Sequence, residues 1–106
     1  MAKNYQLLII NYQLSIIMRI IPGFKLRPLG DEFILVGEGV EQVNFNKMIT
    51  MNDTAAYLWQ QVSDGSEFDA ARLAQMLCSE YEVSESQALQ DAGKTLQAWL
   101  KAGIIA

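Results

Sequence analysis

The sequence predicts one α+β domain, in which a three-stranded antiparallel sheet is followed by three α-helices that cover one face of the sheet. The chain has 106 residues, which is enough for one hydrophobic core and too few for two domains. Short apolar segments between glycine and proline turns fill the part before residue 52. After it come three segments with apolar residues at helical spacing, each preceded by a capping residue.

The sheet is predicted between residues 24 and 51. Its three strands and a further extended stub are Phe24 to Pro28, Glu32 to Val36, Val40 to Phe45 and Met48 to Met51. Glycines in the turns between the strands allow the backbone to reach positive φ. Polar and apolar residues alternate in the third strand, so Val43 and Phe45 point to one face and Gln42 and Asn44 to the other.

The helices are predicted near residues 53–62, 70–80 and 85–101. Asn52, Asp69 and Ser84 stand where a side-chain oxygen accepts a bond from the first-turn amides, and Gly103 suits a left-handed C-terminal cap. The core stripe of the second helix is predicted to hold Ala70, Leu73, Ala74, Leu77 and Tyr81.

Two apolar lines run along the third predicted helix. The first, which we expect to face the core, consists of Ala88, Ala92, Leu96 and Trp99. The second consists of Leu89, Gly93, Leu96 and Leu100. Glycine inside a helix costs about 1 kcal/mol relative to alanine, so Gly93 indicates either close packing or an opening for a ligand.

The composition argues against catalysis, metal binding and a bound cofactor. Histidine is absent, and one cysteine cannot build a zinc site or an internal disulfide. Cys78 lies in an apolar helical pattern, which predicts a free buried thiol. No nucleotide-binding or hydrolase motif occurs. We therefore expect a cytoplasmic protein that is not an enzyme and that needs no oxidising compartment.

Charge is segregated along the chain. All twelve acidic residues lie between Asp31 and Asp91, a stretch whose only bases are Lys47 and Arg72. An acidic body repels phosphate, and nucleic-acid affinity comes mainly from lysine and arginine. The charge distribution therefore predicts no nucleic-acid partner.

The first 17 residues differ from the rest of the chain. Asn4 to Ile10 and Asn11 to Ile17 are two copies of a seven-residue unit that differ only where Leu8 is replaced by Ser15. The segment is too short and too polar to span a membrane. We interpret residues 1–17 as a duplicated extension before a domain at 18–106, with Met18 as an alternative initiator. Its uncharged, β-prone composition offers a route to a homodimer.

The stretch from Val43 to Trp59 resembles the PqqD family. Asn52, Asp53, Thr54 and Ala55 match the start of that family's first helix, with Met51 in place of a leucine. The Tyr81-Glu82-Val83 loop, Asp91 and the terminal Ala102 to Ile105 also fit. The resemblance covers Gly23 to Ile105, and the amino-terminal repeat lies outside the family pattern.

The resemblance implies a winged-helix-like module that binds the leader of a ribosomally made precursor peptide as an added strand. The module then presents that leader to a modifying enzyme, often a radical SAM maturase. Mapped onto this chain, the docking edge is formed by Gln42, Val43, Asn44 and Phe45. The wall of the cleft is formed by Leu89, Gly93, Leu96 and Leu100, where Gly93 replaces a usually larger residue.

Two alternatives remain beside the peptide-binding module. A winged-helix nucleic-acid binder has a similar order of elements, but its recognition helix carries bases, whereas the second predicted helix carries Arg72 alone. An inert structural subunit is not distinguished from a binding module by the sequence. A radical SAM gene and a short open reading frame nearby in the genome would favour peptide binding.

Overall fold

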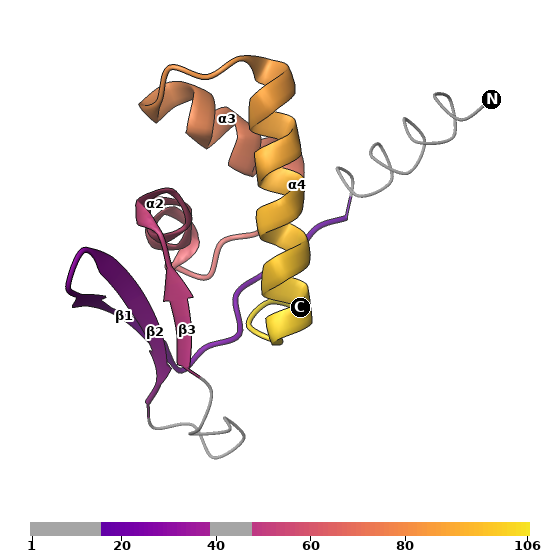
Figure 1. Ribbon diagram of the computed structural model, residues 1–106. Helices are drawn as coiled ribbons and strands as arrows, with labels where there is room; N and C mark the ends of the chain where they lie inside the picture. Colours follow the sequence, from indigo (N-terminus) through magenta and orange to yellow (C-terminus); the bar gives the residue numbers. More distant parts are fainter. Residues whose placement is uncertain (1–15, 39–47) are drawn as a thin grey trace.

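The computed structural model describes residues 16–38 and 48–106, and it confirms the predicted α+β fold. A three-stranded antiparallel sheet precedes three helices (Figure 1). The elements are β1 (Phe24–Leu29), β2 (Glu32–Gly37), β3 (Met48–Met51), α2 (Asp53–Val62), α3 (Ala70–Glu80) and α4 (Glu85–Ala102).

The sheet has the order β1-β2-β3, and both strand pairs are antiparallel. β1 and β2 are joined by a tight turn in which Gly30 has a φ of 61°, a conformation that favours glycine. The third strand differs from the prediction. Met48–Met51, predicted as an extended stub, pairs with β2 from Phe33 to Val36, where β1 occupies the other side. Both sides of β2 are thus filled without Val40 to Phe45, a segment that lies outside the described residues.

The three helices begin and end as predicted because local capping bonds fix their ends. The Oδ1 atom of Asn52 accepts a bond from the Ala55 amide at 2.9 Å, and that of Asp69 accepts from the Arg72 amide at 2.8 Å. The Ser84 hydroxyl accepts from the Gln87 amide at 3.1 Å. At the other end of α4, Gly103 adopts a left-handed φ of 76°. Each such cap typically contributes about 1 kcal/mol.

The core lies between the sheet and the helices. α2 packs on β2 and β3, and α3 packs mainly on α4. The ring centroid of Trp99 lies 5.3 Å from that of Trp59 and 6.2 Å from that of Phe68, both in edge-on contacts. All three rings are buried, which confirms the predicted core position of Trp99. Among the described residues no polar or charged side chain is buried. In the same part of the chain, no helix is both long and apolar enough to cross a bilayer.

Residues 18–21, before the sheet, form backbone hydrogen bonds with Phe68 and with the last residues of the chain. Met18 and Phe68 exchange two backbone hydrogen bonds, of 2.7 and 2.9 Å, and Arg19 and Ala106 exchange two of 2.9 Å. The Met18 side chain is only 6% exposed and belongs to the core. Ile16 is partly buried and packs against the same core. The packed structure therefore reaches back to residue 16.

Two side chains predicted to be buried on α3 or just after it are at the surface. Cys78 is exposed, because it follows the buried Leu77 by one position, about 100° further around the helix. Its thiol lies 3.9 Å from the Val83 carbonyl oxygen. Tyr81 is 38% exposed, because α3 ends at Glu80 and the chain continues in an extended conformation. The Tyr81 ring packs edge-on against Tyr57 instead.

Candidate functional site

β3 is an edge strand. Its partner in the sheet is β2, and no other strand of the described chain pairs with its second side. In an antiparallel ladder, backbone N–H and C=O groups point alternately to the two sides, so every second residue of an edge strand directs them outward. An edge of this kind can accept a further extended chain. Figure 1 shows β3 as the strand of the sheet on the side of α4.

The side chains of β3 divide between the two faces of the sheet. Met51 is 3% exposed and belongs to the core, and Ile49 packs against it while remaining partly accessible. Thr50, between them, is exposed on the opposite face. A strand added beside β3 would thus direct alternate side chains toward the helices and toward solvent.

The predicted docking edge, Gln42 to Phe45, lies outside the described residues. The same topological position, the strand that follows the β2 hairpin and precedes α2, is occupied by β3. The sequence signal that favoured residues 42 to 45 was strict alternation, whereas β3 is too short to show it clearly. The edge strand that the structure describes at this position is therefore Met48–Met51.

On α4 the structure separates the four residues of the predicted cleft wall. Leu96 is 1% exposed and packs in the core with Ala92 and Trp99, so it does not line an open surface. Leu89 is partly buried at the margin of the core. Leu100 is 37% exposed. A side chain added at Gly93 would meet no atom within 4 Å, so the helix has open space at that point.

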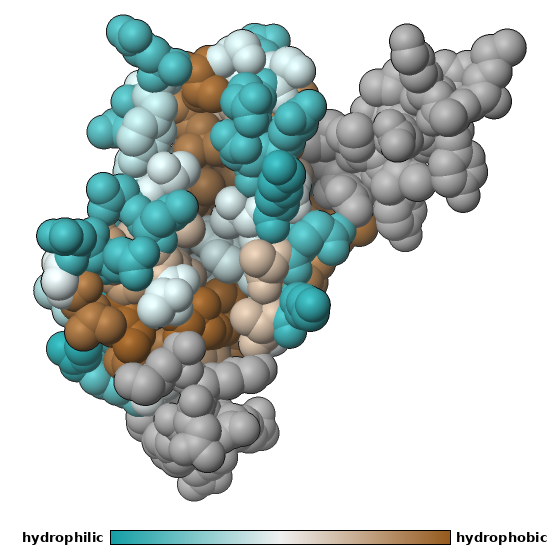
Figure 2. All heavy atoms as spheres, viewed as in Figure 1, coloured by the Kyte–Doolittle hydropathy of each residue, from teal (hydrophilic) through white to brown (hydrophobic). Residues whose placement is uncertain are grey.

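An apolar line on the open side of α4 is bordered by amide and lysine side chains. Residues one turn before and after Gly93 on that side are Leu89, Gln90 and Gln97, followed by Leu100. Lys94 and Lys101 lie one turn after Gln90 and Gln97, whereas the acids Glu85 and Asp91 occupy other positions. Asp91 accepts a side-chain bond from Gln87 at 2.9 Å. The surface around Gly93 thus offers an apolar line formed with Leu89 and Leu100, with lysines beside it. In Figure 2, apolar atoms reach the surface over the sheet, whereas hydrophilic atoms cover much of the upper part of the molecule.

Titratable groups with a shifted pKa do not gather into a catalytic arrangement in the described part of the chain. The side-chain bond from Arg27 lowers the pKa of Glu38, which also pairs with Lys25. Bonds from Ser66 lower the pKa of Asp64, and burial raises that of Tyr57. Within residues 16–38 and 48–106, no three His, Cys, Asp or Glu side chains come close enough to hold a metal ion. Glu38, Asp64 and Tyr57 lie on separate elements, and the surroundings of each account for its shift.

The profile of the family described as Coenzyme PQQ synthesis protein D (PqqD) matches residues 32–105, which is more than half of the chain. The chain belongs to the PqqD family. The match begins at β2 and extends through the last turn of the protein, so it includes β3 and all of α4. Among curated proteins, none matches the sequence.

Two solved structures share the fold. One is described as lasso peptide synthetase B1 complexed with the leader peptide. It has a TM-score of 0.62 and 26% identity, and the alignment covers 84% of this chain and 96% of that one. The other is TbiB1 in complex with the TbiA(beta) leader peptide. It has a TM-score of 0.63 and 15% identity, and the alignment covers 82% of this chain and 93% of that one. The PqqD-family fold of this chain is thus shared with two proteins that were solved with leader peptides.

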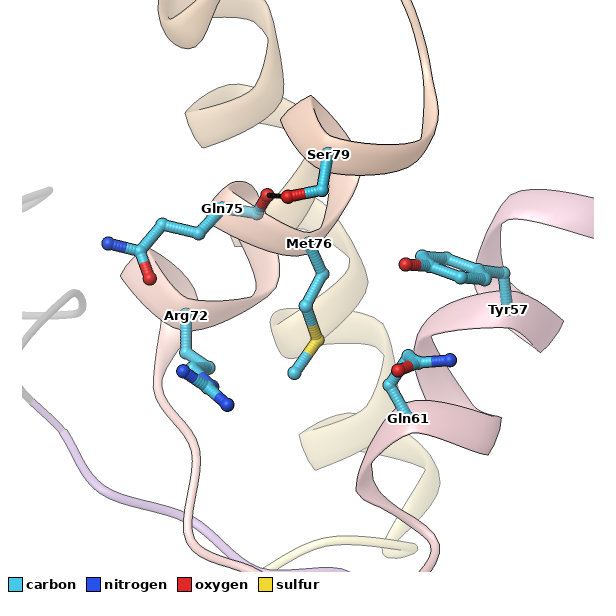
Figure 3. Close-up of a pocket in the computed structure, with 6 residues that line it drawn as sticks. All are labelled: Tyr57, Gln61, Arg72, Gln75, Met76 and Ser79. Atoms are coloured by element: carbon cyan, nitrogen blue, oxygen red, sulfur yellow. Dashed lines mark hydrogen bonds between the residues drawn. The ribbon is translucent and has the colours of Figure 1, made fainter.

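A groove that the sequence does not predict lies between α2 and α3. Tyr57 and Gln61 on α2 line it, together with Arg72, Gln75, Met76 and Ser79 on α3 (Figure 3). Its volume is about 330 Å³. One feature of the sequence could have indicated this groove. Met76 is an apolar residue outside the core stripe of α3, and it follows Arg72, the only base of that helix, by one turn.

Proposed function

We propose that this PqqD-family chain binds the leader of a ribosomally made precursor peptide as a strand added to β3, beside α4. It presents the leader to a separate modifying enzyme, such as a radical SAM maturase, and catalyses no step itself. The observation that carries the proposal is the second side of β3, with which no described strand pairs, together with the open space at Gly93 on α4. This setting is cytoplasmic, where precursor peptides are made and modified.

In this proposal the backbone of β3 contributes affinity and the side chains of α4 contribute selectivity. The outward N–H and C=O groups of β3 give affinity to any extended chain. The apolar line of Leu89, Gly93 and Leu100 adds selectivity, because it favours a leader whose alternate residues are apolar. The leader-bound structures of lasso peptide synthetase B1 and TbiB1 support this assignment.

The decisive experiment is a titration of the full chain with its cognate leader, followed by amide chemical shifts and hydrogen exchange. We expect the largest shifts on β3 and on α4 near Gly93. On addition of the leader, exchange should slow further at alternate β3 amides, either Met48 and Thr50 or Ile49 and Met51, because one set points outward and the other is already bonded to β2. Unchanged exchange at both sets, or shifts centred on α2 and α3, would refute strand addition at this edge.

Leu100→Glu tests the contribution of α4. The introduced charge would face the bound peptide without a partner, at a cost of about 1–3 kcal/mol, or roughly ten- to a hundredfold in affinity. Ala98→Glu is the matched control, because it adds the same charge at an exposed position of the same helix, about 200° around the axis. Equal leader affinity in both variants would remove α4 from the site.

A further inference from the structure

The groove between α2 and α3 has a polar rim and an apolar floor. Tyr57 and Gln61 lie one turn apart on α2, and Arg72, Met76 and Ser79 follow one another at helical spacing on α3. Figure 3 shows the Tyr57 ring extending toward α3, and Met76 between Arg72 and Gln61. Met76 is partly buried and packs against the core, so it forms the floor.

Several donors of this rim are not used inside the described protein. Arg19, Lys25 and Arg27 have ion pairs, whereas the Arg72 guanidinium, like the ammonium groups of Lys94 and Lys101, has none with a described residue. The Gln61 amide and the Tyr57 hydroxyl likewise lack a hydrogen bond within the described part. The Ser79 hydroxyl, by contrast, donates to the Gln75 carbonyl oxygen at 3.0 Å. The groove thus presents a cation and two neutral donors around a methionine.

The electrostatic field along the groove has a direction. Arg72 stands in the first turn of α3, and its guanidinium charge attracts an anion, whereas the amide end of the helix is already capped by Asp69. At the other end of α3, the charge of Glu80 contributes to the raised pKa of Tyr57, after burial as the main cause. The Tyr57 hydroxyl therefore stays protonated as a donor at neutral pH. An anionic group is favoured at the Arg72 end and disfavoured toward Glu80.

We propose that this groove is a second binding site, which takes a short acidic segment of a partner protein, with a carboxylate on Arg72 and an adjacent apolar side chain on Met76. The volume, about 330 Å³, is at the lower end for ligand pockets and suits one or two side chains. The inference rests on the proposed function in one respect: the partner is the enzyme to which the leader is presented. The groove shares no residue with β3 or α4, so leader and partner can be bound together.

The test uses two capped tripeptides as probes, acetyl-Leu-Glu-Leu-amide and acetyl-Leu-Gln-Leu-amide, titrated into the full chain and followed by amide shifts. We expect the shifts to map to α2 and α3, and the glutamate probe to bind about three- to tenfold more tightly. Arg72→Gln should abolish this preference. Lys94→Gln, which removes the same charge from an exposed position of α4, should preserve it. Tyr57→Phe should weaken both probes while keeping the ring.

Three results would overturn the site. They are no binding of either probe at about 10 mM, equal affinity of the two probes for the parent chain, and a preference that survives Arg72→Gln. A fourth is self-association of the parent chain that Arg72→Gln abolishes, which would assign the groove to a second copy. Leader affinity is measured on the same variants and should be unchanged in Arg72→Gln. Loss of leader binding in the parent, with the probe preference intact, would refute the proposed function alone.

Discussion

Two lines of residues run along α4, and the structure uses them differently. Ala88, Ala92, Leu96 and Trp99 are between 0% and 4% exposed and hold the helix against the core. The second line is displaced by one position. Leu89 lies at the margin of the core, Gly93 has open space beside it, and the Leu100 side chain is 37% exposed. Both lines are equally apolar in sequence. The difference teaches that a helical period identifies a face of the helix, whereas the neighbours of that face decide whether it packs or stays open.

The largest expected effect is a difference in the free energy of unfolding between substitutions on the two lines of α4. Leu96→Ala removes a fully buried side chain and leaves a cavity, so we expect the free energy of unfolding to fall by about 2–5 kcal/mol. Leu100→Ala, the matched control on the open line, should change it by no more than about 0.5 kcal/mol. Urea unfolding followed by tryptophan fluorescence measures both. Similar losses in the two variants would mean that both lines are core.

The next effect concerns residues 18–21, the segment before the sheet that pairs with Phe68 and with the end of the chain. A chain that begins at Met18 keeps the backbone pairs with Phe68 and Ala106, and we expect it to melt cooperatively. A chain that begins at Pro22 loses these pairs and the buried Met18 side chain, at a cost of about 2–4 kcal/mol. Thermal unfolding compares the two with the parent. Failure of the Met18 chain to melt cooperatively would place residues 1–17 in the core.

A smaller and more selective effect is expected at Gly93. Gly93→Leu should weaken leader binding about tenfold, because the new side chain occupies space that the structure leaves open. It should not destabilise the fold, since leucine is the better helix former by up to about 1 kcal/mol. Ala98→Leu is the control for a leucine added elsewhere on α4. Tighter leader binding in Gly93→Leu would show that the site is flat at this point.

The smallest expected effect is a change of stability with pH, caused by Asp64 in the surface turn after α2. Bonds from the Ser66 hydroxyl and amide lower the pKa of Asp64 below its ordinary value of 3.8. Its stabilising contribution is therefore complete above about pH 5 and is lost as pH falls through the lowered folded pKa. The unfolding midpoint of Asp64→Asn should be slightly below that of the parent at pH 7, and the difference should vanish near pH 2. A difference that persists at pH 2 would assign the effect to the turn's backbone.

Much of the fold is predictable because it depends on local interactions. Each helix start is marked by one capping residue and a hydrophobic period, and the structure confirms Asn52, Asp69, Ser84 and Gly103 in these roles. The strand next to β2 was not predictable from periodicity. Its four residues show little alternation, and the pairing from Phe33 to Val36 is a contact between segments distant in sequence. The exposure of Cys78 was likewise not predictable, because it depends on which side of α3 packs against the rest of the protein.

The sequence by itself determined the α+β class, the helix ends, the buried Trp99 and the resemblance to the PqqD family, because these depend on short-range pattern and capping. Only the tertiary structure decided which strand forms the described edge of the sheet and that Leu96 packs while Leu100 stays open. It also decided that Tyr57 and Arg72, fifteen positions apart, line one groove. The physical reason is that burial is a property of the assembled layers, since the same apolar side chain is core or surface according to what the rest of the chain places against it.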